Sequence, residues 1–177
     1  MDSKNTKVDE QTWEQVVTDL KNVNIPLQYK ALIHHGSTPV TLAIDIDPGG
    51  GFEGGFELTS LSAAVPIQFT SLTATVSKKD AFRFALHDEG FMDRVGKVFG
   101  MEDIVIGYPE FDKQLIVKTN DGGKLKKVFA DTGIRKVFQA LTDFSLQAKQ
   151  DEENTNDYTL ELMLDKAITD TAELKNV

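Results

Sequence analysis

Residues 29–46 read YKALIHHGSTPVTLAIDI, and this stretch decides the fold class. Apolar side chains alternate along it on both sides of a turn at 34–39: Tyr29, Ala31 and Ile33 before the turn, and Val40, Leu42, Ile44 and Ile46 after it. A period of two is typical of strands with one buried face, because successive side chains point to opposite faces of a sheet. Two such runs around a turn predict an antiparallel β-hairpin.

Further strands are predicted at residues 65–76, 82–86, 104–106, 115–117, 144–148 and 158–164. The first two are separated by a turn at 77–80 and predict a second hairpin. The unbroken apolar run at 115–117 predicts a central strand. Consecutive hairpins bring antiparallel strands together, and we therefore predict a mostly antiparallel sheet.

Helical spacing of apolar residues predicts an N-terminal helix with Asp9 as its N-cap, ending before Pro26. Its apolar stripe consists of Trp13, Val16, Val17, Leu20 and Val23, which share one face at 3.6 residues per turn. Three shorter amphipathic helices are predicted at 91–99, 125–129 and 134–141. Helices grouped beside hairpins predict an α+β fold in which the helices pack on the sheet.

The composition is that of one folded domain. The 177 residues are 40% hydrophobic and include 11 Phe and one Trp, enough for a substantial core. We predict a single domain over residues 1–177, with residues 1–7 and about 168–177 as candidates for disorder. The N-terminus lacks the apolar run of a signal peptide, and no stretch approaches the roughly 20 apolar residues of a membrane helix. A cytoplasmic location is expected.

Net charge and cysteine content exclude several classes of function. A formal net charge of −9 disfavours nucleic acid and anionic membranes as partners. The absence of Cys excludes disulfides, thiolate nucleophiles and Cys-based metal sites. Residues 113–136 are nonetheless basic, because they contain two acids against seven bases: Lys113, Lys118, Lys124, Lys126, Lys127, Arg135 and Lys136. This basic stretch is either a solvated face or an interaction surface.

Two motifs resemble ligand-binding loops but lack the context that such loops require. Residues 49–54 read GGGFEG and match a dinucleotide-binding pattern, yet a strand is predicted at 56–58 where a helix should begin. Asp45 and Asp47 lie just before this loop. An EF-hand starting at Asp45 would need an oxygen ligand at its fifth residue and a glutamate at its twelfth, and neither is present. We therefore expect a hairpin connection, no cofactor and no metal site.

His87 and Asp112 are the candidate catalytic residues. His87 precedes Asp88, a carboxylate suited to orienting an imidazole, but neighbouring side chains on a strand point to opposite faces. Asp88 is also a good N-cap for the helix predicted at 91–99. Asp112 follows a predicted turn at 107–109, where an aspartate commonly accepts hydrogen bonds from backbone amides, and Phe111 beside it is a candidate core residue.

Residues 91–113 read FMDRVGKVFGMEDIVIGYPEFDK and follow the pattern F-x-D-R-x-G-K…G-x-x-D-I-x-x-G-x-P-x-F-D-K/R. This segment resembles one found in a bacterial domain family of unknown function, where it leads into a strand and then helices. The resemblance extends to about Leu141. It implies a shared domain, and it implies no reaction, cofactor or catalytic residue.

These observations favour a non-catalytic binding or interaction domain, with an unidentified protein or small molecule as its partner. A dimeric chaperone-like protein is one form of this interpretation, so a homodimer is a candidate assembly. The alternative is a hydrolase-type enzyme whose site is assembled from residues distant in sequence, such as His87 and remote carboxylates. A buried polar pocket with a perturbed histidine would favour the enzyme, and an exposed apolar patch would favour the binding domain.

Overall fold

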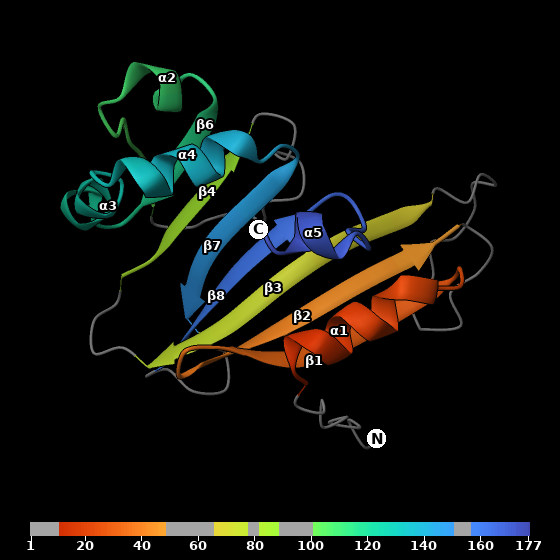
Figure 1. Cartoon of the computed structure of the whole chain (residues 1–177). Coiled ribbons are helices and arrows are strands. Elements are labelled where there is room, and N and C mark those ends of the chain that lie inside the picture. The colour runs from red at the N-terminus through yellow and green to blue at the C-terminus, as the bar shows by residue number, and fades with distance from the viewer. Residues whose placement is uncertain (1–10, 49–65, 78–81, 89–100, 151–156) are drawn as a thin grey trace, which may run out of the picture. The chain divides into compact units, whose positions relative to one another are not determined.

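The computed structural model describes residues 11–48, 66–77, 82–88, 101–150 and 157–177. It confirms an α+β fold with an N-terminal helix, several shorter helices and a mostly antiparallel sheet (Figure 1). The chain divides into two compact units. The N-terminal unit comprises Met1–Ser71 together with Lys166–Val177, and the central unit comprises Leu72–Asp165. Each unit contains both helices and strands.

Helix α1 opens the described part of the N-terminal unit and spans Trp13–Asp19. Its N-cap is Thr12, so the prediction of Asp9 as the cap is wrong. The Thr12 hydroxyl accepts a hydrogen bond from the Gln15 backbone nitrogen at 3.3 Å, and the Gln15 side chain accepts one from the Thr12 backbone nitrogen at 2.7 Å. This capping box provides acceptors for the backbone N–H groups of both Thr12 and Gln15. A capping aspartate alone would provide an acceptor for the N–H groups of the first turn but none for its own backbone N–H.

The predicted hairpin follows α1 and a short 3-10 helix, η1, at Leu20–Asn22. Its strands are β1 at Leu27–His35 and β2 at Thr38–Asp47, and they pair in antiparallel register. Ala31 lies opposite Leu42, and both are fully buried. Because both belong to the predicted apolar alternation, the period of two identified the buried face correctly.

The hairpin turn is tighter than the sequence predicted. The strands extend to His35 and Thr38, so only Gly36 and Ser37 connect them, and the prediction of a turn over 34–39 is too long. Gly36 has φ of 62°, a left-handed conformation that glycine adopts without the steric cost of a Cβ atom. His34 is consequently a strand residue rather than a loop residue.

The N-terminal unit also contains the C-terminal segment, Lys166–Val177, and the first residues of β3. Strand β3 spans Ile67–Ser77, and helix α5 spans Thr171–Leu174. The Asp170 side chain caps α5 by accepting hydrogen bonds from two backbone amides of its first turn, at 2.8 and 3.0 Å. Ile168 and Leu174 are 1% and 5% exposed. The segment that was a candidate for disorder therefore contains a capped helix and buried side chains.

Among the described residues of the central unit, five antiparallel strands lie in the order β8-β7-β4-β6-β5. They are β4 at Phe84–Asp88, β5 at Glu102–Asp103, β6 at Leu115–Thr119, β7 at Phe144–Gln150 and β8 at Asp157–Leu164. Strand β4 pairs with β6 and β7, so the predicted hairpin between 65–76 and 82–86 is wrong. The strand predicted at 104–106 is also wrong in its position, because β5 ends at Asp103.

The three described helices of the central unit lie on one face of these strands (Figure 1). They are α2 at Pro109–Asp112, α3 at Gly122–Val128 and α4 at Thr132–Ala140. A row of aromatic rings joins them to the sheet, with centroid distances of 4.9 Å for Phe111–Phe129, 5.9 Å for Phe129–Phe138 and 5.8 Å for Phe138–Phe144. The helix predicted at 91–99 and the glycine loop at 49–54 lie outside the described residues.

Candidate functional site

The candidate site is a partly open cavity of about 250 Å³ at the end of β4, within the central unit. Strand β4 contributes Asp88, and the chain entering β6 contributes Lys113, Gln114 and Leu115. The end of α4 and the residues after it complete the lining with Phe138, Gln139, Leu141 and Thr142. The cavity thus has an apolar wall and several polar groups, and its only charged residues are Asp88 and Lys113 among the described lining.

Asp88 is held at this position by the strand pattern of β4. It pairs with Leu115 at the start of β6 and lies on the same face as Leu86, which is fully buried. Its Oδ2 atom accepts a hydrogen bond from the Asp143 backbone nitrogen at 2.5 Å. Its Oδ1 atom is buried, and no described residue donates a hydrogen bond to it. One carboxylate oxygen is therefore anchored and the other is without a donor.

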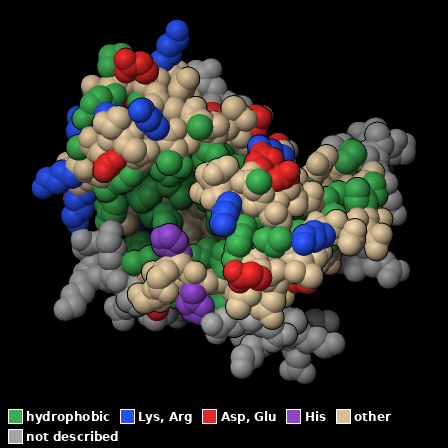
Figure 2. All heavy atoms as spheres, viewed as in Figure 1, with side chains coloured by type: hydrophobic (Ala, Val, Ile, Leu, Met, Phe, Trp, Pro, Cys, Tyr) green, Lys and Arg blue, Asp and Glu red, His purple; other side chains and the backbone are tan. Residues whose placement is uncertain are grey.

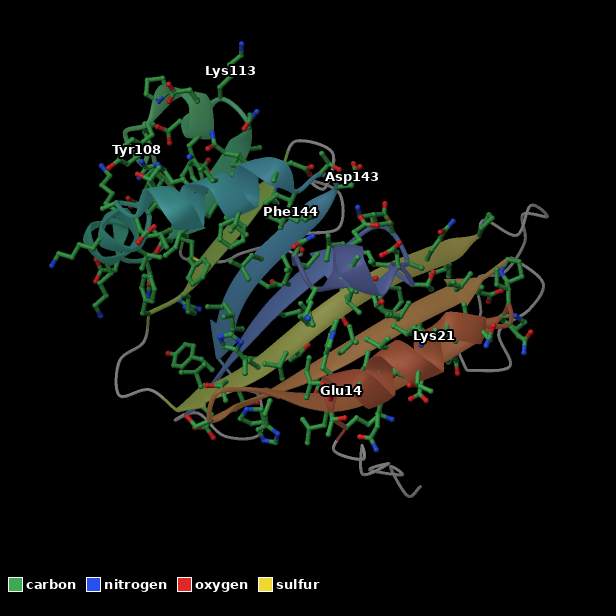
Figure 3. All side chains as sticks on the ribbon, viewed as in Figure 1. Glu14, Lys21, Tyr108, Lys113, Asp143 and Phe144 are labelled. Carbon is green, nitrogen blue, oxygen red and sulfur yellow. The ribbon has the colours of Figure 1, made fainter. Side chains whose placement is uncertain are left out.

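Asp143 forms the tight corner that brings the anchoring amide to Asp88. Its φ of 52° is left-handed, a conformation that aspartate tolerates better than most residues. Its carbonyl oxygen accepts a hydrogen bond from the Asp165 backbone nitrogen at 2.9 Å. The next residue, Phe144 (Figure 3), is fully buried. Its ring stacks on that of Phe138 of α4. The corner thereby connects α4 to β7 directly after Leu141 and Thr142, which line the cavity.

Of the two charged residues in the lining, Lys113 has its charge in solvent and Asp88 has a buried carboxylate oxygen. The Lys113 side chain points away from the central unit (Figure 3), so its aliphatic stem lines the cavity while its ammonium group faces solvent. The buried Oδ1 atom of Asp88 is the acceptor that remains inside. A second hollow, of about 160 Å³ and lined by apolar side chains and Tyr158, offers no comparable charged group. Of these two hollows, only the one beside Asp88 has a carboxylate in its described lining.

His87, the first candidate catalytic residue, does not line this cavity. It is 2% exposed, and its Nδ1 atom lies 2.9 Å from the Asp88 carbonyl oxygen. It pairs with Ile116 of β6 and Ser145 of β7, which places it on the opposite face of the strands from the Asp88 side chain. As the sequence predicted, adjacency of His87 and Asp88 does not create a carboxylate–imidazole pair.

Asp112, the second candidate, is used by the turn that precedes it. Its Oδ1 atom accepts a hydrogen bond from Ile106 N at 2.7 Å, and its Oδ2 atom accepts one from Gly107 N at 2.8 Å. Gly107 has φ of 109°, which an L side chain rarely adopts. Phe111 beside it is fully buried. These contacts match the structural role that the turn chemistry predicted for both residues.

The role of Asp88 was missed in the sequence because the residue was interpreted as a helix cap. The sequence did contain a sign that Asp88 is partly buried. Residues 84, 86 and 88 alternate onto one face of β4, and Leu86 on that face belongs to the core. A carboxylate that continues a buried apolar alternation is unusual, because burying a charge is costly unless it is paired. Its partner comes from Asp143, 55 residues later.

The aspartates before the glycine loop lie on β2, and Asp47 is its last residue. Asp45 is half-buried rather than on a fully solvated face, and burial raises the pKa of its carboxyl group. Among the described residues, no group of three or more His, Asp or Glu side chains is arranged to hold a metal ion.

The comparisons with known proteins add no identity: no protein-family model and no curated protein matches this sequence. In the part of the chain that the structure describes, every helix is too short or too polar to cross a membrane.

Proposed function

We propose that this protein is a non-catalytic binding domain whose ligand occupies the cavity beside Asp88. The observation that supports the proposal is the buried Asp88 Oδ1 atom, which receives no hydrogen bond from any described residue. A buried acceptor without a donor costs about 1–3 kcal/mol, and more when it is charged. Because the atom is shielded from solvent, a ligand in the cavity recovers that cost only if the carboxylate turns toward it and accepts its hydrogen bond.

The lining defines the chemistry of this ligand. It carries an N–H or O–H donor, preferably cationic, for Asp88, and an apolar part that packs against Phe138 and Leu141. The amides of Gln114 and Gln139 offer further polar contacts. Pockets for drug-sized molecules usually measure about 300–1,000 Å³. A cavity of about 250 Å³ fits a smaller molecule, or one group of a larger one.

Binding is favoured over catalysis because the two candidate catalytic residues are separated from the cavity. Both oxygens of Asp112 are engaged by backbone amides, and His87 lies on the opposite face of β4. Acid–base catalysis needs a proton donor or acceptor within reach of the substrate. The described lining contains one carboxylate and no histidine, which supports a site that holds its ligand without transforming it.

The experiment uses benzylamine, which is protonated at neutral pH and combines a cationic donor with an apolar ring. Benzoate is the matched probe without a donor. We expect benzylamine to raise the Tm of the protein in a concentration-dependent manner, because ligands of the native state stabilise it by mass action, and benzoate to have no effect. The shift should disappear in Asp88→Asn and persist in Glu110→Gln, an exposed carboxylate on α2.

Two outcomes contradict the proposal. Equal stabilisation of the wild-type protein and Asp88→Asn would show that benzylamine binds elsewhere, and no stabilisation at all would show that the cavity does not take a cationic donor. The enzyme alternative is tested with 4-nitrophenyl acetate, a general ester substrate. Hydrolysis above background that is lost in His87→Gln would favour the hydrolase instead.

A further inference from the structure

The outer face of α4 is unusual because it mixes apolar and basic side chains where a solvated helix usually carries polar ones. Its exposed residues include Gly133, Lys136, Val137 and Ala140, which lie three or four positions apart and so share one face. Val137 is 44% exposed. Phe138, on the other side of the helix, packs on the aromatic core. The helix thus has one partnered apolar face and a second, exposed face with apolar residues.

The end of α3 has the same mixture of side chains. Lys126, Lys127 and Val128 are all exposed, and Val128 is 44% exposed. The buried ring of Phe129 and the α4 cap Asp131 follow directly, so the two helices are joined by a very short connection. We call the exposed residues Lys126, Lys127, Val128, Lys136, Val137 and Ala140 the α3–α4 surface. Figure 2 shows Lys and Arg side chains gathered over this part of the central unit.

The charges of this surface are unpaired within the described residues. Other bases of the basic stretch have partners: Lys118 pairs with Asp103 at 3.4 Å, and Lys124 pairs with Asp121 at 3.7 Å. The Arg135 guanidinium donates to the Phe129 and Ala130 carbonyl oxygens and lies 3.5 Å from the centre of the Tyr108 ring. By contrast, no described carboxylate forms an ion pair with the three lysines of the α3–α4 surface.

The acids nearest in sequence to these lysines have other partners in the described structure. Asp121 and Asp131 cap α3 and α4 through backbone amides, and Asp112 holds the turn before α2. A cationic surface of this kind therefore gains most from charges that a partner supplies. The partner must also cover Val128 and Val137, since exposed apolar side chains gain free energy when they leave water.

We propose that the α3–α4 surface docks an acidic, amphipathic segment of a partner protein, with carboxylates on the three lysines and apolar side chains on the two valines. Nucleic acid fits less well, because the surface offers lysines without aromatic rings to stack on bases, and the whole chain has a net charge of −9. The proposal rests on the exposed face of two helices and is independent of a ligand beside Asp88.

The test uses a synthetic helical peptide with leucines along one face and glutamates on the others, labelled for fluorescence anisotropy. We expect it to bind the full chain, and we expect the affinity to fall as salt is added because exposed charge pairs are screened. The triple variant Lys126→Glu/Lys127→Glu/Lys136→Glu should weaken binding about tenfold or more, since like charges then face one another. Val137→Asp should weaken it as well.

Controls separate this surface from a general attraction between charges. The double variant Lys21→Glu/Lys30→Glu changes exposed lysines of the N-terminal unit and should leave peptide binding unchanged. Failure of the wild-type protein to bind the peptide overturns the proposal, as does equal binding by the triple variant. Binding of oligo-dT or phosphatidylserine vesicles as tightly as the peptide, with the same loss in the triple variant, would assign the surface to another polyanion and also overturn it.

Discussion

The Thr70 hydroxyl connects β3 to the backbone of Ile168, which follows it by 98 residues in the chain. Thr70 Oγ1 accepts a hydrogen bond from Ile168 N at 2.8 Å and donates one to the Lys166 carbonyl oxygen at 2.9 Å. Thr70 is fully buried and Ile168 nearly so. A single side chain therefore satisfies two backbone groups of the C-terminal segment inside the N-terminal unit.

We predict that Thr70→Val lowers the free energy of unfolding by about 1–3 kcal/mol, because it leaves the buried Ile168 amide and the part-buried Lys166 carbonyl without this partner. Valine preserves the shape of threonine, so the loss reports the hydroxyl. Thr75→Val, at an exposed position of β3, should change the value by less than about 0.5 kcal/mol. Urea denaturation of the three proteins measures the difference, and equal midpoints would contradict the prediction.

The raised pKa of the Tyr29 hydroxyl leads us to predict that the protein loses stability at high pH. The single hydroxyl proton of Tyr29 is shared between Gln11 Oε1 at 2.6 Å and Asp19 Oδ2 at 3.3 Å. Burial, followed by the charge and the hydrogen bond of Asp19, raises the pKa of Tyr29 to about 12. Between its ordinary pKa of about 10 and this value, the folded state holds a proton that the unfolded state has lost. Stability contributed by this group is therefore present below about pH 10 and is lost as the pH rises.

The Tyr29→Phe variant tests this dependence. We expect the free energy of unfolding to fall less steeply above pH 10 in the variant than in the wild-type protein. Absorbance titration of tyrosinate should also lose a step near pH 12. Identical slopes in the two proteins would mean that the Tyr29 hydroxyl titrates at its ordinary pKa.

Asp112→Asn should destabilise the central unit by about 1–3 kcal/mol, because an amide retains one acceptor oxygen for the two amides of Ile106 and Gly107. Phe111→Ala should cost roughly 3–5 kcal/mol, the usual range for emptying a buried aromatic site. Chemical denaturation measures both. A stabilised Asp112→Asn together with a tolerated Phe111→Ala would refute the structural role of this turn and favour a functional one.

The same substitution at Asp88 should behave differently. Asparagine keeps an acceptor for the Asp143 amide and removes the buried negative charge, so Asp88→Asn should leave stability within about 1 kcal/mol or raise it. Residues retained for binding often cost stability in the absence of their ligand. Thermal unfolding of Asp88→Asn beside Asp112→Asn makes the comparison. A loss at Asp88 as large as that at Asp112 would indicate that Asp88 is a structural residue.

For β4, the sequence predicted the strand itself but not the strands that pair with it. The alternation at Phe84 and Leu86 predicts a strand, and β4 indeed spans Phe84–Asp88. Its neighbours were wrongly predicted, because an alternating apolar strand fits any partner that offers a complementary face. The choice of β6 and β7 over the adjacent β3 depends on contacts between residues far apart in the chain.

The sequence by itself determined the features that depend on short-range geometry. The period of two placed Ala31 and Leu42 in the core of a hairpin, and turn chemistry assigned Asp112 to amides only a few residues away. Only the tertiary structure decided which strands flank β4, and with them the hydrogen bond between the Asp143 amide and the Asp88 carboxylate. The physical reason is the separation of the interacting residues along the chain. Backbone periodicity determines the pattern of nearby residues, whereas contacts between distant residues depend on the packing of the whole fold.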